Sequence, residues 1–230
     1  LPDTENGVVT ANSVEIIDRM YQVMVGQTYT EMLEGMSGMM GGLGDNMRQS
    51  TNMWTELMDN QKLLEQQYTL VEGKWPENYN EVVIAVNSDL SINDLYLYAL
   101  GLKPRKEFEE NLQKMKNGET LPVEHNSYTF DEILNLNYKL VLNCDKYVKE
   151  NNVWVDKSSD TEFFKEVIDN AITIKVVGII KPAEAAIAKS MQGLLGYRAS
   201  LVEEVVTRTN NSAIVKEQKT SQNRDVFTGY

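Results

Sequence analysis

The sequence contains one cysteine and one histidine among its 230 residues. Cys144 alone excludes an internal disulfide and a thiolate metal cage, and we expect it to be a small, partly buried side chain. His125 cannot form a histidine-rich zinc site by itself, and we expect it to lie solvated in a loop. Motifs for phosphate binding (GxxxxGK[ST]) and for serine hydrolysis (GxSxG, SxxK) are missing. The sequence therefore predicts no catalytic residue, no metal site and no cofactor.

Basic residues are also few: 22 lysines and arginines stand against 34 aspartates and glutamates, giving a net charge of −12. They are scattered and form no stripe that could follow a phosphate backbone, so we expect no nucleic acid partner. The same charge repels anionic lipid. Adhesion of the whole domain to a membrane surface would therefore depend on apolar contacts.

Long apolar runs are lacking as well. No segment approaches the roughly 20 residues that a transmembrane helix needs. The sequence starts at Leu1 with no initiator methionine and no signal-peptide pattern, and we expect it to be a fragment of a larger protein. Its 42% hydrophobic and 24% charged residues are typical of a folded globular chain.

Strand and helix patterns mix without strict alternation, which predicts an α+β fold with a mixed or antiparallel sheet and flanking helices. We expect one domain over residues 1–230, with an alternative division into subdomains formed by residues 1–90 with 171–230 and by 91–170. The β-branched run 172–180 is the strongest predicted strand. Strands at 68–71 and 81–86 are predicted to form a β-hairpin or a near relative of one. A helix is predicted at 51–60, and a final strand at 226–227.

Nine of the eleven methionines lie between residues 20 and 58, around a glycine-rich run at 35–44. We expect residues 35–50 to form a flexible segment. Three interpretations stay open: core filling beside a mobile loop, an adaptable apolar partner surface, and a copper(I) site. The residues of the partner surface would be Met32, Met36, Met39, Met40 and Met47.

A positive functional signal comes from the sequences YTLVEGKWP at 68–76 and NEVVIAV at 80–86. They resemble a passage in the extracytoplasmic domains of MacB/FtsX-type permeases of ABC transporters, especially those of Firmicutes. Segments at 95–102, 138–143, 174–182 and 225–229 resemble later parts of those domains in the same order. The residues that carry this resemblance, for which we expect structural roles, are Gly73, Trp75, Pro76, Asn80, Glu81, Gly101, Gly178 and Pro182.

The resemblance implies a non-catalytic domain inserted between two transmembrane helices of a permease, at the extracellular face of the bacterial cytoplasmic membrane. Such a domain would be dimeric in the full transporter. It would couple ATP hydrolysis by an ABC ATPase to export of a peptide, lipid or protein substrate, or to an extracellular partner. Two alternatives stay open: a free-standing extracellular binding or adhesion module, and an enzyme with a noncanonical site.

Overall fold

The computed structural model describes residues 8–12, 54–92, 94–117, 119, 127–184, 186 and 194–230. The predictions on the flexible segment 35–50, on the five methionines of the expected partner surface and on His125 lie outside these residues. Within the described part, no helix is both long enough and apolar enough to cross a membrane.

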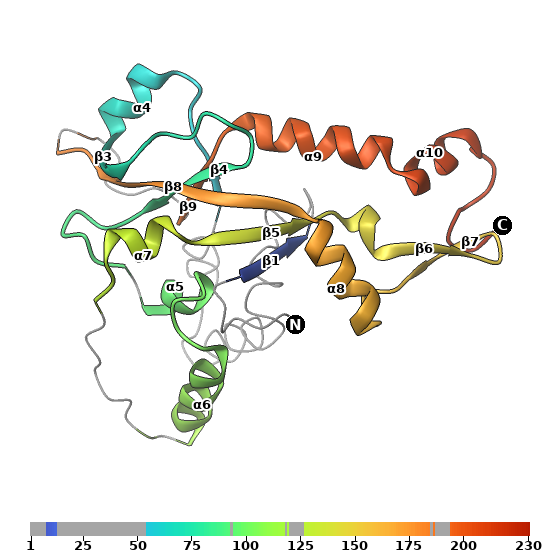
Figure 1. The fold of residues 1–230 in the computed structure, drawn as a ribbon, viewed down its shortest axis with the longest axis horizontal. Helices are drawn as coiled ribbons and strands as arrows, with labels where there is room; N and C mark the ends of the chain where they lie inside the picture. The colour runs from blue at the N-terminus through green and yellow to red at the C-terminus, as the bar shows by residue number, and fades with distance from the viewer. Residues whose placement is uncertain are drawn as a thin grey trace, which may run out of the picture.

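A mixed seven-stranded sheet forms the centre of the molecule (Figure 1), and helices flank it, as expected for an α+β fold. The strand order is β1-β5-β8-β4-β9-β2, and β3 pairs with β8 beside this path. The strands are β1 (Val8–Asn12), β2 (Trp54–Glu56), β3 (Tyr68–Gly73), β4 (Glu81–Ala85), β5 (Asn137–Val141), β8 (Ile172–Pro182) and β9 (Leu195–Tyr197). Strands from both of the expected subdomain segments therefore share one sheet.

Strand β8 is the longest described strand and pairs with three others. Along one edge it pairs first with β5, through residues 172–175, and then with β3, through residues 178–182. Along the other edge it pairs with β4. Its side chains Ile172, Ile174, Val176, Ile179 and Ile180 are buried. This burial explains why the β-branched run gave the strongest strand signal.

Strands β3 and β4 do not pair with each other, so they form no β-hairpin. Strand β8 lies between them, antiparallel to β3 and parallel to β4. The pairing skips Val71 in β3 and Val177 in β8, which marks a bulge in each strand. An apolar strand that offers two edges can separate two neighbouring strands in this way, and local sequence does not reveal it.

Four of the described helices begin at a residue whose side chain caps free N–H groups. Asn60, Asp160 and Ser212 cap α4, α8 and α10, and Thr129 forms the expected capping box of α7 with Glu132. Bounds are α4 (Gln61–Gln67), α5 (Asp94–Ala99), α6 (Arg105–Lys116), α7 (Phe130–Leu134), η3 (Asn143–Lys146), α8 (Thr161–Asn170), α9 (Ala199–Asn211) and α10 (Ala213–Thr220). In Figure 1, α9 runs above the sheet, and α5 and α6 lie below it.

The main core contains residues from α5, from α9 and from the strands of the sheet. Helix α5 contributes Ala99, the following turn contributes Leu100, and α9 contributes Leu201 and Val205. The strand residues of the same cluster include Val82, Ile84, Tyr138, Leu140, Ile174 and Val176. A second, smaller cluster under α4 is formed by Leu57, Leu64, Val83 and Ile180.

Two predicted elements were wrong. Residues 54–56, predicted as part of a helix, form strand β2, because Trp54 is buried and pairs with β9 while its ring packs 6.1 Å from that of Tyr197. Residues 226–227, predicted as a strand, form a turn. There the Asp225 carboxylate accepts hydrogen bonds from the backbone N–H groups of Phe227 and Thr228, at 2.9 and 2.7 Å.

A projecting arm extends from one end of the sheet, on the right of Figure 1. We define the arm as residues 146–157, which contain the hairpin β6 (Tyr147–Glu150) and β7 (Val153–Asp156), together with residues 212–230. Asn151 and Asn152 turn the hairpin with φ values of 47° and 67°, the conformation that a tight two-residue turn requires. The hairpin and the C-terminal residues are joined by a hydrogen bond from Trp154 N to Val226 O at 2.8 Å.

Candidate functional site

Gly73 and Gly178 lie where the backbones of β3 and β8 come into direct contact. Gly73 has φ +79°, and a Cβ atom there would collide with the carbonyl oxygen of Val177. A Cβ atom on Gly178 would collide with the carbonyl oxygen of Lys74 and lie 3.1 Å from Val83 Cγ1. The backbone N of Lys74 donates a hydrogen bond to Val177 O at 2.8 Å. Both glycines therefore permit a close approach of the two backbones that a residue with a Cβ atom would prevent.

The Glu81 carboxylate organises the loop between β3 and β4. Its Oε2 accepts the backbone N–H groups of Glu77 and Asn78 at 2.8 and 3.0 Å, and its Oε1 lies 3.0 Å from Lys74 Nζ. Burial alone would raise the pKa of Glu81. The hydrogen bonds from Asn78, Glu77 and Lys74 outweigh that effect and lower its pKa to about 2. The loop is thus held around one ionised carboxylate.

Asn80 and Pro76 fasten this loop to its surroundings. Asn80 Nδ2 donates to Thr173 O at 2.9 Å, and Asn80 O accepts from Lys175 N at 2.8 Å, so both bonds reach β8. Pro76 is buried, whereas Trp75 is half-buried against the small cluster under α4. The structure therefore brings together Gly73, Trp75, Pro76, Asn80, Glu81 and Gly178.

The other two motif residues lie elsewhere. Gly101 follows α5 with φ +75° and ends that helix, as its position in the sequence predicted. Pro182 is the last residue of β8 and pairs with Tyr68 of β3.

Arg198 was not singled out from the sequence, yet its side chain forms hydrogen bonds to the loop between β3 and β4, to the segment after β2 and to α4. It is the single residue between β9 and α9. Its guanidinium donates to Pro76 O at 3.2 Å, to Met58 O at 2.8 Å and to Gln61 Oε1 at 2.6 Å. Helix α9 is therefore fixed at its first turn to the loop of Glu81 and to the start of α4.

Replacing Arg198 with alanine should lower the free energy of unfolding by about 2–3 kcal/mol, because three charge-assisted hydrogen bonds are lost at once. Arg208→Ala, within α9, is the control. Arg208 pairs with Glu204 at 2.7 Å and donates to the Tyr79 hydroxyl at 3.3 Å, but its side chain is 45% exposed, so its loss should cost less than about 1 kcal/mol. Urea denaturation of both variants measures the difference. Equal losses would show that Arg198 does not fix the helix.

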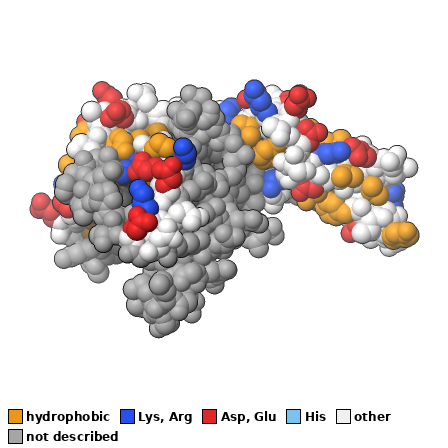
Figure 2. All heavy atoms as spheres, turned by 90° about the horizontal axis from the view of Figure 1, so that it is seen from below, with side chains coloured by type: hydrophobic (Ala, Val, Ile, Leu, Met, Phe, Trp, Pro, Cys, Tyr) orange, Lys and Arg blue, Asp and Glu red, His pale blue; other side chains and the backbone are white. Residues whose placement is uncertain are grey.

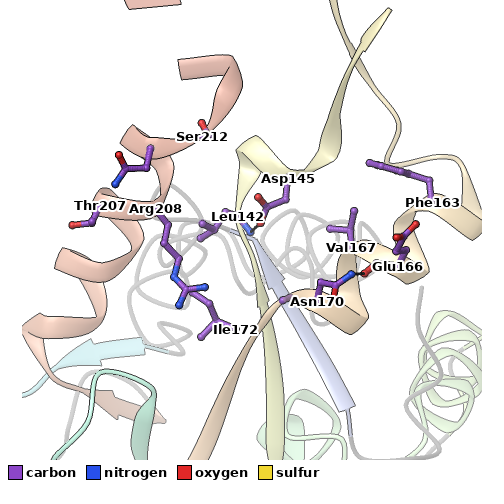
Figure 3. A pocket seen from close by; sticks show the side chains of 12 residues that line it. Leu142, Asp145, Phe163, Glu166, Val167, Asn170, Ile172, Thr207, Arg208 and Ser212 are labelled. Carbon is purple, nitrogen blue, oxygen red and sulfur yellow. Dashed lines mark hydrogen bonds between the residues drawn. The ribbon is translucent and has the colours of Figure 1, made fainter. Parts of the chain in front are cut away.

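A pocket of about 600 Å³ opens where the arm meets the sheet (Figure 3). Helix α8 and the start of β8 form one wall, and the end of α9 forms the other. Figure 3 shows Phe163 and Val167 on the α8 side and Thr207 and Arg208 on the α9 side. The lining residues are Leu142, Asp145, Phe163, Glu166, Val167, Asn170, Ala171, Ile172, Thr207, Arg208, Asn211 and Ser212. The lining contains both apolar and polar groups.

Cys144 lies next to this pocket in sequence, between the lining residues Leu142 and Asp145. It is half-buried, which confirms the expected small, partly buried side chain. Burial raises the pKa of its thiol, and the neighbouring Asp145 charge acts in the same direction. A thiol with a raised pKa is a weak nucleophile at neutral pH. Among the described residues, no group of three or more His, Cys, Asp or Glu side chains could hold a metal ion.

No family model matches the chain, and no match was found among the curated proteins or the solved structures. The resemblance to MacB/FtsX-type permeases therefore stays a prediction that depends on the sequence motifs.

Proposed function

We propose that this chain is a non-catalytic extracytoplasmic domain of a MacB/FtsX-type ABC transporter permease, which passes ATP-driven movement of transmembrane helices to a substrate or partner outside the cell. The observation that carries the proposal is the connection between the arm and the sheet. Helix α9 follows β9 after Arg198 alone, and Arg198 is bonded to three other points. Displacement of the arm would therefore act directly on the sheet.

The connection between β5 and the hairpin of the arm is also short. Strand β5 ends at Val141, η3 covers residues 143–146, and β6 begins at Tyr147. The chain joins the arm to the sheet three times: through η3 after β5, through α8 before β8, and through Arg198 and α9 after β9. Strands β5 and β9 are inside the sheet, on either side of β8 and β4. A few residues at the ends of such elements are where a hinge or shear movement takes place.

The pocket supports the same proposal, because α8 and α9, which form its two walls, both connect the sheet to the arm. Movement of α9 relative to α8 would change its width, and a peptide, lipid or protein segment with apolar groups is the class of substrate that its lining suits. The motif residues support a structural role as well. They permit the close approach of β3 and β8 and hold the loop around the Glu81 carboxylate in place. They present no nucleophile with an adjacent base.

In the proposed arrangement, the domain is continuous with transmembrane helices of the same polypeptide, works with an ABC ATPase and is dimeric in the full transporter. These partners follow from the resemblance.

The experiment follows the parent protein in its own cells, with Lys165→Cys on exposed α8 in a Cys144→Ser background. A maleimide that cannot cross membranes should label the protein in intact cells, and the protein should stay in the membrane fraction after an alkaline carbonate wash. A cytoplasmic protein in the same sample provides the control. Recovery in the culture medium, or labelling only after lysis, would contradict the proposal.

A further inference from the structure

The arm differs in charge from the rest of the chain. It contains six basic residues and four acidic ones, whereas the whole chain has a net charge of −12. The basic residues are Lys146, Lys149, Lys157, Lys216, Lys219 and Arg224. The arm is therefore the positive end of a strongly negative molecule, which the overall charge conceals.

Acidic groups of the arm are engaged in internal contacts. Glu217 Oε2 lies 2.8 Å from Lys149 Nζ and accepts the Trp154 indole N–H at 3.0 Å. Glu150 pairs with Lys157 at 2.7 Å. The Asp225 carboxylate is held by its own turn.

Two lysines on α10 stay available to an outside partner. Lys216 and Lys219 are exposed, and neither forms an ion pair with any of the residues that the structure describes. Lys219 Nζ donates to the neutral amide of Asn210 at 2.8 Å. These cations can therefore bind external anions at little cost.

Aromatic side chains are exposed at the same end of the molecule. Phe227 is 48% exposed, and Tyr147 is half-buried beside it. The ring of Tyr147 lies 5.2 Å from that of Phe227, edge to face. Figure 2 shows hydrophobic side chains gathered at the outer end of the arm, among basic, acidic and other polar groups. Aromatic side chains and lysines are residue types that settle at the headgroup level of a bilayer.

We infer that the arm binds the surface of an anionic lipid bilayer, with its aromatic side chains in the headgroup region and its lysines on lipid phosphates. This deepens the proposed function and rests on it, because it makes the arm the part of the domain nearest the membrane. The charge of the whole chain argued against electrostatic adhesion. The uneven distribution of that charge reverses the conclusion for the arm alone.

The test is co-sedimentation of the 230-residue chain with vesicles of equal parts phosphatidylglycerol and phosphatidylcholine, compared with phosphatidylcholine alone. We expect binding to the anionic vesicles only, weakened by added salt. Replacing Lys216 and Lys219 with glutamine should weaken binding about fivefold for each lysine. Phe227→Ser should weaken it further.

The matched control is the pair Lys62→Gln and Lys165→Gln on α4 and α8, both exposed and outside the arm, which should bind like the unaltered chain. Absence of binding to anionic vesicles would overturn the inference, as would an equal loss in the control pair. Either result would concern only the bilayer contact, because cell fractionation and surface labelling test the proposed function separately.

Discussion

Replacing Gly73 with alanine should lower the free energy of unfolding by about 3 kcal/mol or more. Part of this loss, about 1–2 kcal/mol, comes from placing a side chain at a positive φ. The remainder comes from the collision of the new Cβ with the carbonyl oxygen of Val177. That oxygen belongs to the bulge in β8 and already accepts the hydrogen bond of Lys74 N, so it cannot move aside without losing this hydrogen bond.

Gly229→Ala is the control that separates these two causes. Gly229 has almost the same φ, +80°, but its added Cβ would meet side-chain atoms only, Val153 Cγ1 at 3.1 Å and Arg224 Nη2 at 3.6 Å, and no backbone oxygen. We expect it to lose only about 1–2 kcal/mol. Guanidinium denaturation of both variants gives the comparison, and an insoluble Gly73→Ala chain beside a soluble Gly229→Ala chain would agree with it. Equal losses of unfolding free energy would mean that the contact between β3 and β8 at Gly73 is not tightly packed.

Replacing Glu81 with glutamine should cost about 3 kcal/mol at pH 7. The folded protein lowers the pKa of Glu81 from its ordinary value of 4.5 to about 2. A lowered pKa means that folding stabilises the ionised form, at about 1.4 kcal/mol per pH unit. The stabilisation is fully present above about pH 4.5 and is lost as the pH falls through 2. Glutamine cannot replace the charge that holds Lys74 and the two backbone N–H groups.

The pH dependence of this difference identifies its cause. The gap in unfolding free energy between the unaltered chain and Glu81→Gln should be widest above pH 5 and nearly closed at pH 2. Glu166→Gln, at an exposed position on α8, should change stability by less than about 0.5 kcal/mol. A gap that is constant from pH 2 to pH 7 would show that shape, and not the ionised carboxylate, makes Glu81 important.

The parts of the fold that could be predicted are those in which local chemistry decides. The capping box of Thr129 and Glu132 and the helix end at Gly101 depend on residues within a few positions. The apolar run of β8 is readable because its strand is buried. Strand β2 could not be predicted, because its pattern also fits a helix and only its pairing with β9, far along the sequence, selects the strand.

The same limit applies to the candidate site. The glycines and Glu81 were singled out from a motif, but the sequence did not show that Gly73 and Gly178 meet. Arg198 gave no local signal at all. Its partners Met58, Gln61 and Pro76 lie more than 100 residues earlier, and only the folded structure brings them to its guanidinium. The pocket between α8 and α9 likewise exists only in three dimensions.

The most direct test of the central claim is a distance between the arm and the sheet, measured in the full-length protein in membranes. Spin labels on Lys216→Cys in α10 and Lys62→Cys in α4, in a Cys144→Ser background, report this distance by pulsed electron paramagnetic resonance. The account predicts that the distance distribution shifts between the nucleotide-free and ATP-bound states of the transporter. An identical distribution in both states would contradict it, because the proposed hinge movement between the arm and the sheet would then not occur.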